Sequence, residues 1–404
     1  MIGSDFTELS TCVACLNSDL SCTLDLGYQP LANDFIDSNA ELEEYPLKLM
    51  RCMECNHSQI SISVNPARLF RNYVYVSGTS DTLNQYFNKL ANKIVVEFGN
   101  NGKILDIGSN DGSFLSKFKD LGWLGLGVDP AINLISNSVS LGVLTIPAFF
   151  NLNVAKLLSS EFEVVVAMNI FAHTSDPLDI LLGIKSCLRD NGKAFIQTSQ
   201  ADMFLTGQFD TVYHEHISFF NVKSMKALLA RADMYLANVT IVPIHGGSYL
   251  WEITKNPNQE CFSDREHFEH NMGFYGHDLY DKFSRIVDEK ALKVKNIIQD
   301  FRTQNFTVVS YGAAAKGNTF INFSGIKLDY IFDDTPQKIG KRSPAGFCNV
   351  SNPLLLAEIN APVLVLCPAW NFKEEILKKV RDLRRNPKDQ FLTYFPEVDL
   401  QSIN

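Results

Sequence analysis

The stretch KILDIGSNDGSFLSKF, residues 103–118, decides the fold of the central part of the chain. It begins with an apolar run that ends at Ile107 and passes through a turn with glycines at both ends, Gly108 and Gly112. It continues into a pattern that predicts a helix from about Ser113. Glycines let a backbone come close to a ligand. The stretch therefore predicts a strand, a ligand-binding turn and a helix.

Acidic residues distinguish this turn from a dinucleotide-binding one. Asp106 precedes the turn and Asp111 lies within it, and both would repel a pyrophosphate. The next predicted strand, in WLGLGVDP, ends at Asp129, which is placed to accept ribose hydroxyls unless it only caps a turn. A cationic nucleoside fits these charges, so the chemistry favours S-adenosylmethionine (SAM) over NAD.

The D-x-G-x-N-x-G turn and the acid after it resemble class I SAM-dependent methyltransferases. The resemblance implies that Phe149 or Phe150, after a third strand, packs on adenine, although both are equally expected in the core. It also places the end of a fourth strand, in EVVVAMNIFAH, beside the methionine part of SAM. The cofactor-binding residues that we expect are Asp106, Gly108, Asn110, Gly112, Asp129, Phe149, Asn169 and His173.

Two C-x2-C pairs lie near the N-terminus and predict a metal site. Cys12 and Cys15 form the first pair, and Cys52 and Cys55 form the second. Four thiolates close a tetrahedral Zn²⁺ site with no open position, so the predicted metal is structural. The alternative is four ordinary cysteines. Cys22 and His57 lie outside both pairs.

Composition limits the classes of partner. The chain has 404 residues and a net charge of −9, with no basic block, which argues against nucleic acid and anionic membranes. No apolar run is long enough for a transmembrane helix, and the N-terminus does not resemble a signal peptide. We expect a cytoplasmic protein of two to three domains. Its oligomeric state stays open, with a monomer preferred.

The segment TVYHEHISFF, residues 211–220, carries four neighbouring polar side chains: Tyr213, His214, Glu215 and His216. The two histidines alternate with the acid, so they would not easily share a metal ion with it if the segment is extended. In a turn, the grouping is open. One histidine can act as a base near neutral pH, and Glu215 or Tyr213 can orient it or bind an oxyanion. The alternative is a buried hydrogen-bonded network.

The C-terminal third repeats the strand–turn–helix pattern in TVVSYGAAAKGNTF. The turn after Gly312 has small residues and one cation, Lys316, at a helix start, and Asp333 follows the next strand. This environment suits a diphosphate. A further strand brings Trp370 and Asn371 to the same edge. The alternative is helix packing alone.

Five motifs in one order make a more specific resemblance: the C-x2-C pairs, DIGSNDGSF, YHEHISFF, HGGS and YGAAAKGNT. Together they resemble sugar C-methyltransferases that act on nucleotide-linked 4-keto-6-deoxyhexoses in deoxysugar biosynthesis, where branched-chain sugars are made. The resemblance covers almost the whole chain. It implies His216 as the base, with Tyr213 and Glu215 in the same site. His214, between them in the sequence, is a further candidate to donate to the enolate. One departure is Leu250, where family members often have arginine. The substrate-binding residues that we expect are Tyr75, His245, Gly246, Ser248, Gly312, Lys316, Gly317, Asn318, Thr319, Asp333, Trp370 and Asn371.

The predicted fold class is α/β with three parts. Residues 1–68 form a zinc-binding module, residues 69–258 a class I methyltransferase domain, and residues 259–404 a helical linker and a Rossmann-like domain for the nucleotide sugar. The predicted reaction is methylation at C3 of a dTDP- or GDP-linked keto sugar through an enolate, with S-adenosylhomocysteine (SAH) as coproduct. The alternatives are a nucleotide-sugar O- or N-methyltransferase, a C5 methyltransferase, an inactive nucleotide-sugar sensor and a zinc-stabilised nucleic-acid binder.

Overall fold

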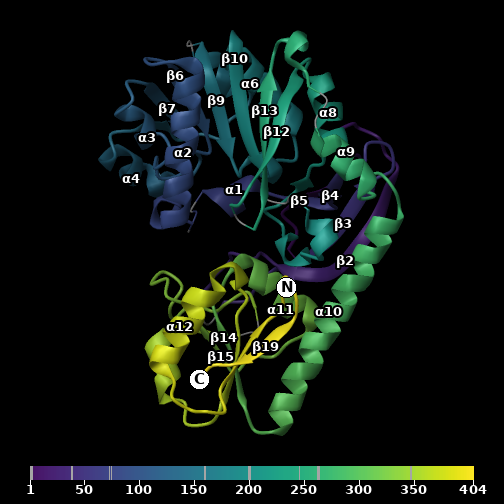
Figure 1. Ribbon diagram of the computed structural model, residues 1–404, viewed down its shortest axis with the longest axis vertical. Coiled ribbons are helices and arrows are strands. Elements are labelled where there is room, and N and C mark those ends of the chain that lie inside the picture. The colour runs from purple at the N-terminus through teal and green to yellow at the C-terminus, as the bar shows by residue number, and fades with distance from the viewer. Residues whose placement is uncertain are drawn as a thin grey trace.

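The computed structural model describes residues 3–37, 40–71, 73, 75–158, 161–198, 202–244, 246–261, 264–345 and 348–404. One predicted site residue, His245, lies outside the described residues. Figure 1 shows two α/β parts at opposite ends of the molecule, with the N-terminal strands between them. The long helix α10 (Asp278–Thr303) runs along one side.

The N-terminal part holds a four-stranded antiparallel sheet in the order β11-β4-β3-β2. Three of its strands are β2 (Leu20–Pro30), β3 (Glu44–Cys52) and β4 (Ser58–Ile60). The fourth, β11 (Ser218–Phe219), comes from far along the chain and directly follows the YHEH segment. A small separate ladder pairs β1 (Phe6–Glu8) with β5 (Ile62–Val64). The catalytic candidate segment is therefore attached to the N-terminal sheet.

The central part is a seven-stranded sheet in the order β12-β13-β10-β9-β6-β7-β8, parallel except where β13 pairs with its two neighbours. This is the class I methyltransferase arrangement that the sequence predicts. The strands are β6 (Lys103–Ile107), β7 (Leu124–Val128), β8 (Leu144–Ile146), β9 (Phe162–Met168), β10 (Leu188–Thr198), β12 (Tyr235–Val242) and β13 (Ser248–Thr254).

Buried aliphatic runs explain why the central strands form. Val164, Val165 and Val166 of β9 are fully buried, as expected for a strand covered on both faces. The covering helices are α2 (Asp81–Phe98), α3 (Ser116–Lys119), α4 (Ile135–Ser140), α5 (Leu152–Leu157), α6 (Pro177–Cys187) and α8 (Val222–Arg231). The short helix α7 (Met203–Thr206) packs against α10 instead. Short 3-10 turns are η1 (Ser77–Thr79), η2 (Ile132–Leu134), η3 (Phe171–His173) and η4 (Phe209–Thr211).

The helix after the glycine turn begins later than the sequence suggests. We predicted a start near Ser113, whereas regular helix begins at Ser116. The N–H of Ser116 donates to the carbonyl of Gly112 at 2.9 Å, so helical hydrogen bonding does reach back to the turn. The left-handed Gly112, with φ of +80°, keeps the intervening residues from forming a regular first turn.

The C-terminal part is a second sheet in the order β16-β15-β14-β17-β18-β19, parallel except for β19. Its strands are β14 (Thr307–Tyr311), β15 (Tyr330–Phe332), β16 (Val350–Ser351), β17 (Val363–Leu366), β18 (Gln390–Thr393) and β19 (Asp399–Ser402). Its helices are α11 (Ala315–Ser324) and α12 (Lys373–Leu383), with η6 (Pro353–Glu358) and η7 (Trp370–Phe372). This confirms the predicted Rossmann-like architecture.

Three short helices complete the fold: α1 (Pro66–Phe70), η5 (Pro257–Gln259) and α9 (Asp264–Asn271). The long α10 packs against β2 and α11, so it ties the N-terminal strands to the C-terminal sheet. Among the described residues, no helix is both long and apolar enough to cross a membrane.

Candidate active site and metal centre

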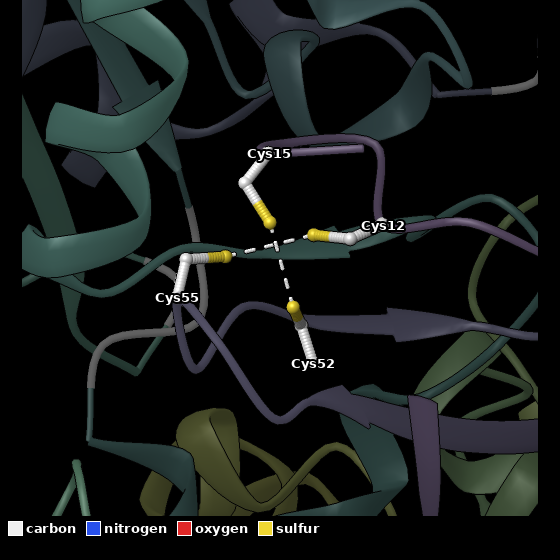
Figure 2. A group of neighbouring side chains, drawn as sticks. All are labelled: Cys12, Cys15, Cys52 and Cys55. Carbon is white, nitrogen blue, oxygen red and sulfur yellow. Dashed lines mark hydrogen bonds between the residues drawn. The ribbon is translucent and has the colours of Figure 1, made fainter. Parts of the chain in front are cut away.

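The four predicted metal ligands come together at the N-terminus. Figure 2 shows the sulfur atoms of Cys12, Cys15, Cys52 and Cys55 facing one another, and all four lie within 4.8 Å of each other. The Sγ atoms of Cys12 and Cys55 are 3.6 Å apart, and those of Cys15 and Cys52 are 3.5 Å apart. Zinc–sulfur bonds of about 2.3 Å give a tetrahedron with edges of roughly 3.8 Å. The residues fit a structural Zn²⁺.

The two C-x2-C turns share one backbone geometry. In each, the residue after the second cysteine, Leu16 or Asn56, has a positive φ and donates its N–H to the carbonyl of the first cysteine. The turns are fixed by helix α8: Arg231 donates to the carbonyls of Val13 and Ala14, and Lys223 donates to that of Glu54. The metal centre therefore supports the methyltransferase part as well as its own strands.

The glycine turn after β6 is held by the predicted ribose acid. The N–H of Asn110 donates to one carboxylate oxygen of Asp129 at 2.7 Å, and the N–H of Ala131 donates to the other at 2.7 Å. Burial raises the pKa of Asp129, against the opposing effect of these two N–H donors. Gly108 and Asn110 both have positive φ, which explains the glycine and asparagine there.

Asp106 offers a buried carboxyl group to a cationic cofactor. Its side chain is 2% exposed, and its Oδ1 has no hydrogen-bond partner among the residues that the structure describes. Burial, and then the neighbouring Asp129, raise the pKa of Asp106 well above its usual range. A buried carboxyl group in this state is stabilised as an anion by an arriving cation. The turn therefore fits SAM.

A segment near the N-terminus of α2 covers this turn. The N–H groups of Ser77 and Gly78 donate to the side chains of Asn110 and Asp111, and Asn110 donates in turn to the carbonyl of Tyr75. The ring of Tyr75 is 41% exposed. The structure thus places Tyr75 beside the cofactor turn, although we predicted it as a substrate residue; its role stays a prediction.

The ends of β9 and β10 add polar groups at the same edge of the central sheet. Asn169, with φ of +59°, accepts a hydrogen bond from Gln197 Nε2 at 3.1 Å. Gln197 has no sequence signal beyond its place at a strand end. Of the two predicted aromatic residues, Phe150 is buried against Gly183 of α6, so it belongs to the core, whereas Phe149 is half-buried.

The YHEH segment is a turn, closed by a hydrogen bond of 2.8 Å from the N–H of His216 to the carbonyl of Tyr213. The turn brings the Tyr213 hydroxyl within 2.8 Å of His216 Nε2, while His216 Nδ1 lies 2.8 Å from the carbonyl of Thr211. Because a carbonyl only accepts, Nδ1 carries the proton and Nε2 has the lone pair. The His173 ring stacks on His216 at 5.2 Å and connects this pair to the end of β9.

The other two side chains of the turn point to different partners. Glu215 accepts from Asn33 Nδ2 at 2.6 Å and from the Tyr73 hydroxyl at 3.2 Å. His214 lies 3.3 Å from the carbonyl of Pro46 in the N-terminal sheet, and burial lowers its pKa to about 4. The turn therefore separates His214 from the Tyr213–His216 pair, since alternation along a strand does not apply to a turn.

The turn after β14 repeats the first turn. The N–H of Ala313 donates to one oxygen of Asp333 at 2.7 Å, and the N–H of Thr335 donates to the other at 2.9 Å. Although burial raises the pKa of Asp333, Lys338 and these donors outweigh it and lower the pKa below its usual range. A cavity of about 290 Å³ opens here between the ends of β14, β15 and β17; Gly312 and Asp333 line it with Tyr311, Asp334 and Lys379.

A second group of predicted residues lies where the C-terminal part meets the central part. Lys316 Nζ is 5.1 Å from the centre of the Trp370 ring, and Trp370 Nε1 donates to Asp210 at 2.9 Å. Desolvation lowers the pKa of Lys316, and the charge of Asp210 opposes this. Gly246, with φ of +88°, lies against Trp370, where a Cβ would come within 2.8 Å of the ring. The predicted residues Lys316, Trp370 and Gly246 are thus neighbours.

Several predicted substrate residues have visible structural uses. Gly317 lets α11 approach Pro368 closely, since a Cβ there would lie 2.3 Å from the proline ring. Asn318 donates to the carbonyl of Ala32, and the Ser248 hydroxyl donates to that of Ile244. Thr319 is buried and Asn371 is exposed. For Gly317 and Asn318 the helix-packing alternative accounts for the residue type, and their contact with a ligand remains a prediction.

Known families match the chain in three consecutive segments. A "Putative zinc binding domain" model matches residues 12–70, a "Methyltransferase domain" model matches residues 80–239, and a "C-methyltransferase C-terminal domain" model matches residues 243–396. The chain is also 25% identical to the C-methyltransferase NovU of Streptomyces niveus, over 96% of each chain. The chain is a SAM-dependent C-methyltransferase. SAM is its cofactor, and Zn²⁺ is its structural metal.

More distant likenesses cover less of the enzyme. It is 29% identical to the tRNA U34 carboxymethyltransferase of Dichelobacter nodosus over 32% of the chain and 42% of that protein. Magnesium protoporphyrin IX methyltransferase from Synechocystis PCC 6803, solved with SAM, is 10% identical, with a TM-score of 0.34, over 43% of the enzyme and 79% of that chain. A TehB-like methyltransferase from Corynebacterium glutamicum is 17% identical, with a TM-score of 0.33, over 44% and 99%. These likenesses do not bear on the substrate.

Proposed function

We propose that the enzyme transfers the methyl group of SAM to C3 of a nucleoside-diphosphate-linked 4-keto-6-deoxyhexose, in deoxysugar biosynthesis. The observation that carries the proposal is the position of the Tyr213–His216 pair. On one side, His173 stacks on His216 and connects the pair to the end of β9, beside the proposed SAM site. On the other side, the charge of Asp210 acts both on Tyr213 and on Lys316, which neighbours Trp370. The relative from Streptomyces niveus supports carbon as the acceptor.

A substrate with a nucleotide at one end and a keto sugar at the other fits this line of residues. The cavity beside Asp333 and Asp334 suits a nucleoside, because carboxylates accept ribose hydroxyls. The start of α11 and Lys316 suit the diphosphate, because they offer N–H groups and a cation. The sugar then lies between the C-terminal part and the central part, near the carboxylate of Asp210 and the hydroxyl of Tyr213.

Proton removal is the work of His216. Its Nδ1 donates to the carbonyl of Thr211, which fixes the ring and puts the lone pair on Nε2. In the structure that lone pair accepts from the Tyr213 hydroxyl at 2.8 Å. In the proposed reaction the hydroxyl turns to the enolate oxygen, and Nε2 takes the proton from C3. The C4 ketone acidifies that proton, and the electron pair of the C3–H bond moves into the enolate. Burial, and then the charges of Glu215 and Asp210, raise the pKa of Tyr213 well above 10. Tyr213 therefore keeps its proton and can donate to the enolate oxygen.

SAM supplies an electrophilic methyl group when bound, and SAH is the coproduct. The C3 carbanion forms the new carbon–carbon bond as the sulfur–methyl bond breaks, and the bonding pair stays on sulfur. The proton remains on His216 Nε2 and then leaves to solvent. Asp106 balances the positive charge of the cofactor before transfer. The ketone is the electron sink throughout.

The identifying experiment uses heavy water. The enzyme is incubated with SAM and a panel of dTDP- and GDP-linked 4-keto-6-deoxyhexoses, and the products are read by mass spectrometry and NMR. We expect a methyl group on C3, and deuterium at C3 when SAM is left out. A methyl on oxygen, a methyl on C5, or turnover of reduced sugars only would contradict the proposal. Binding of both ligands without any turnover would identify a sensor instead.

His216→Asn tests the base. We expect turnover and C3 deuterium exchange to fall more than 10³-fold, since a general base contributes roughly 10²–10⁴-fold and the enolate cannot form without it. SAM affinity should stay within a factor of three. The matched control is His214→Asn, in the same turn, which should keep exchange because its side chain faces Pro46. Normal methylation by the His216 variant would refute the assignment.

A further inference from the structure

The residues 31–37, here called the 31–37 loop, join the N-terminal sheet to both other parts of the molecule. The loop begins with a turn in which the N–H of Asp34 donates to the carbonyl of Leu31 at 3.0 Å. Its Ala32 carbonyl accepts from Asn318 of α11 at 2.7 Å, and Ile36 pairs with Arg342 as a β-bridge. The loop is thus fixed to the C-terminal part at two places.

Between these two anchors, Asn33 reaches the candidate active site. Its Nδ2 donates to Glu215 Oε1 at 2.6 Å, across 182 positions of the sequence. The other carboxylate oxygen accepts from the Tyr73 hydroxyl at 3.2 Å. Glu215 is 3% exposed, so water does not solvate it. A buried carboxylate without donors is strongly disfavoured, so these two bonds decide its state.

The groups around Glu215 offer it no ion pair among the described residues. Tyr73 and Tyr213 are neutral phenols whose pKa values the charge of Glu215 helps to raise. On its own turn the neighbouring titratable groups are His214 and His216, and His173 stacks on His216. On the loop, Asp34 is already paired with Arg68 at 2.7 Å. Among the contacts that the described residues make with this carboxylate, the hydrogen bond from the Asn33 amide is the shortest.

We propose that Asn33 is a positioning residue of the methyl-transfer site, which holds Glu215 ionised and fixed beside the Tyr213–His216 pair. The inference rests on the proposed function only in giving that pair its chemistry. An ionised Glu215 favours the imidazolium that forms when His216 takes a proton, and it keeps the Tyr213 hydroxyl protonated. The N-terminal module thus supplies a residue that acts on the reaction through Glu215, in addition to its structural metal.

The balance at Glu215 is close enough for one donor to matter. Burial raises its pKa to about 7, and the bonds from Asn33 and then Tyr73 act in the opposite direction. Loss of the Asn33 amide therefore raises the pKa further. A hydrogen bond to a charged group corresponds to a shift of roughly one to two pH units. At neutral pH, such a shift converts most of the carboxylate to the acid.

The first test reads Glu215 directly and needs no substrate. Infrared difference spectra of the holoenzyme across pH 5 to 9 give the protonation midpoint of Glu215, and Glu215→Gln assigns the band. We expect Asn33→Ala to raise the midpoint by roughly one to two units. Asn33→Asp, which keeps the size of the side chain, should raise it further by like charge. Asp34→Asn is the matched control, because losing a negative charge can only lower the midpoint.

The second test reads the reaction. In Asn33→Ala, the acidic limb of the pH profile of kcat/KM should move up by the same shift, with KM changed less than kcat. In a Glu215→Gln background, Asn33→Ala should add less than a twofold loss. An unmoved midpoint, or a loss that is independent of pH and persists in that background, overturns the inference. If His216→Asn stays active while the midpoint moves, the proposed function fails and the positioning role stands.

Discussion

The two glycine turns of the molecule are built alike and charged differently. After β6, the carboxylate of Asp129 accepts from the N–H of Asn110 and of Ala131; after β14, that of Asp333 accepts from Ala313 and Thr335. In both cases, one donor N–H belongs to the turn and the other belongs to the residue two positions after the acid. The same backbone device thus recurs in both sheets.

The pKa values of the two acids are shifted in opposite directions. Burial raises the pKa of Asp129, which lies near a second buried acid, Asp106. Burial acts in the same direction on Asp333, but the charge of Lys338 at 3.4 Å and the hydrogen-bond donors outweigh it and lower the pKa. Lys316 adds a second cation to the C-terminal turn. The two turns thus share one backbone geometry, whereas the charges beside their acids differ: a second acid lies near Asp129, and a cation lies beside Asp333.

Metal removal should produce the largest difference between the two halves of the molecule. The cysteine turns form hydrogen bonds with α8, and β4 pairs with β11, next to the YHEH turn. The C-terminal part, in contrast, contacts the N-terminal part through the 31–37 loop. With Cys52→Ser, we expect turnover to fall more than 100-fold, because structural zinc contributes folding free energy outright. Nucleoside diphosphate affinity should fall less than threefold. Calorimetry with SAM and with a nucleoside diphosphate measures the two affinities. An equal loss of both affinities would contradict the idea that the metal centre supports the central part more than the C-terminal part.

Charge reversal at the C-terminal turn should separate the two ligands. For Lys316→Glu, we expect nucleoside diphosphate affinity to fall about 100-fold, roughly 3 kcal/mol, which is the size of a partly buried charge contact. SAM affinity should stay within a factor of two, because its turn lies in the other sheet. Lys316→Met is the neutral control, with a smaller loss. Equal effects on both ligands would mean that the turns are not independent.

The smallest expected effect is on the pH dependence of stability. Asp333 has a lowered pKa, so its contribution is present above the unfolded pKa of about 4 and is lost only below it. Asp129 has a raised pKa, so its contribution is full below about 4 and declines as pH rises through the folded pKa. From pH 7.5 down to 4.5, the destabilisation by Asp333→Asn, about 1–2 kcal/mol, should stay constant, whereas that by Asp129→Asn should grow. Urea unfolding at several pH values measures the destabilisation by each substitution. The same pH dependence for both substitutions would contradict the opposite pKa shifts of the two acids.

Local patterns were enough for the strands that flank the two turns, for the turns and for their acids. Apolar runs bounded by glycine fix strand ends, and an acid directly after a strand stays at the edge of the sheet. The cysteine pairs were predictable for the same reason, since each turn is local. Phe150 was ambiguous because an apolar residue after a strand suits core and crevice equally, and packing against Gly183 decided it.

Contacts between distant segments were not predictable. Whether the YHEH segment is a strand or a turn depends on β11 pairing with β4, a partner that no neighbouring residue reveals. Asn33 reaches Glu215 across 182 positions of the sequence. Asp210 was also overlooked, and it accepts from both Trp370 and Tyr394. A single sequence shows such residues only as polar positions between apolar ones, and covariation between homologues is the signal that would reveal them.

The late origin of β11 has a consequence for synthesis on the ribosome. The strands β2, β3 and β4 emerge early, but the strand that completes their sheet lies beyond residue 217. At about 5–20 residues per second, the nascent N-terminal module waits roughly ten to thirty seconds with one open edge. The metal can close the cysteine turns during that interval, because all four ligands are already exposed from the ribosome. The metal site is therefore complete in sequence before the sheet that it supports.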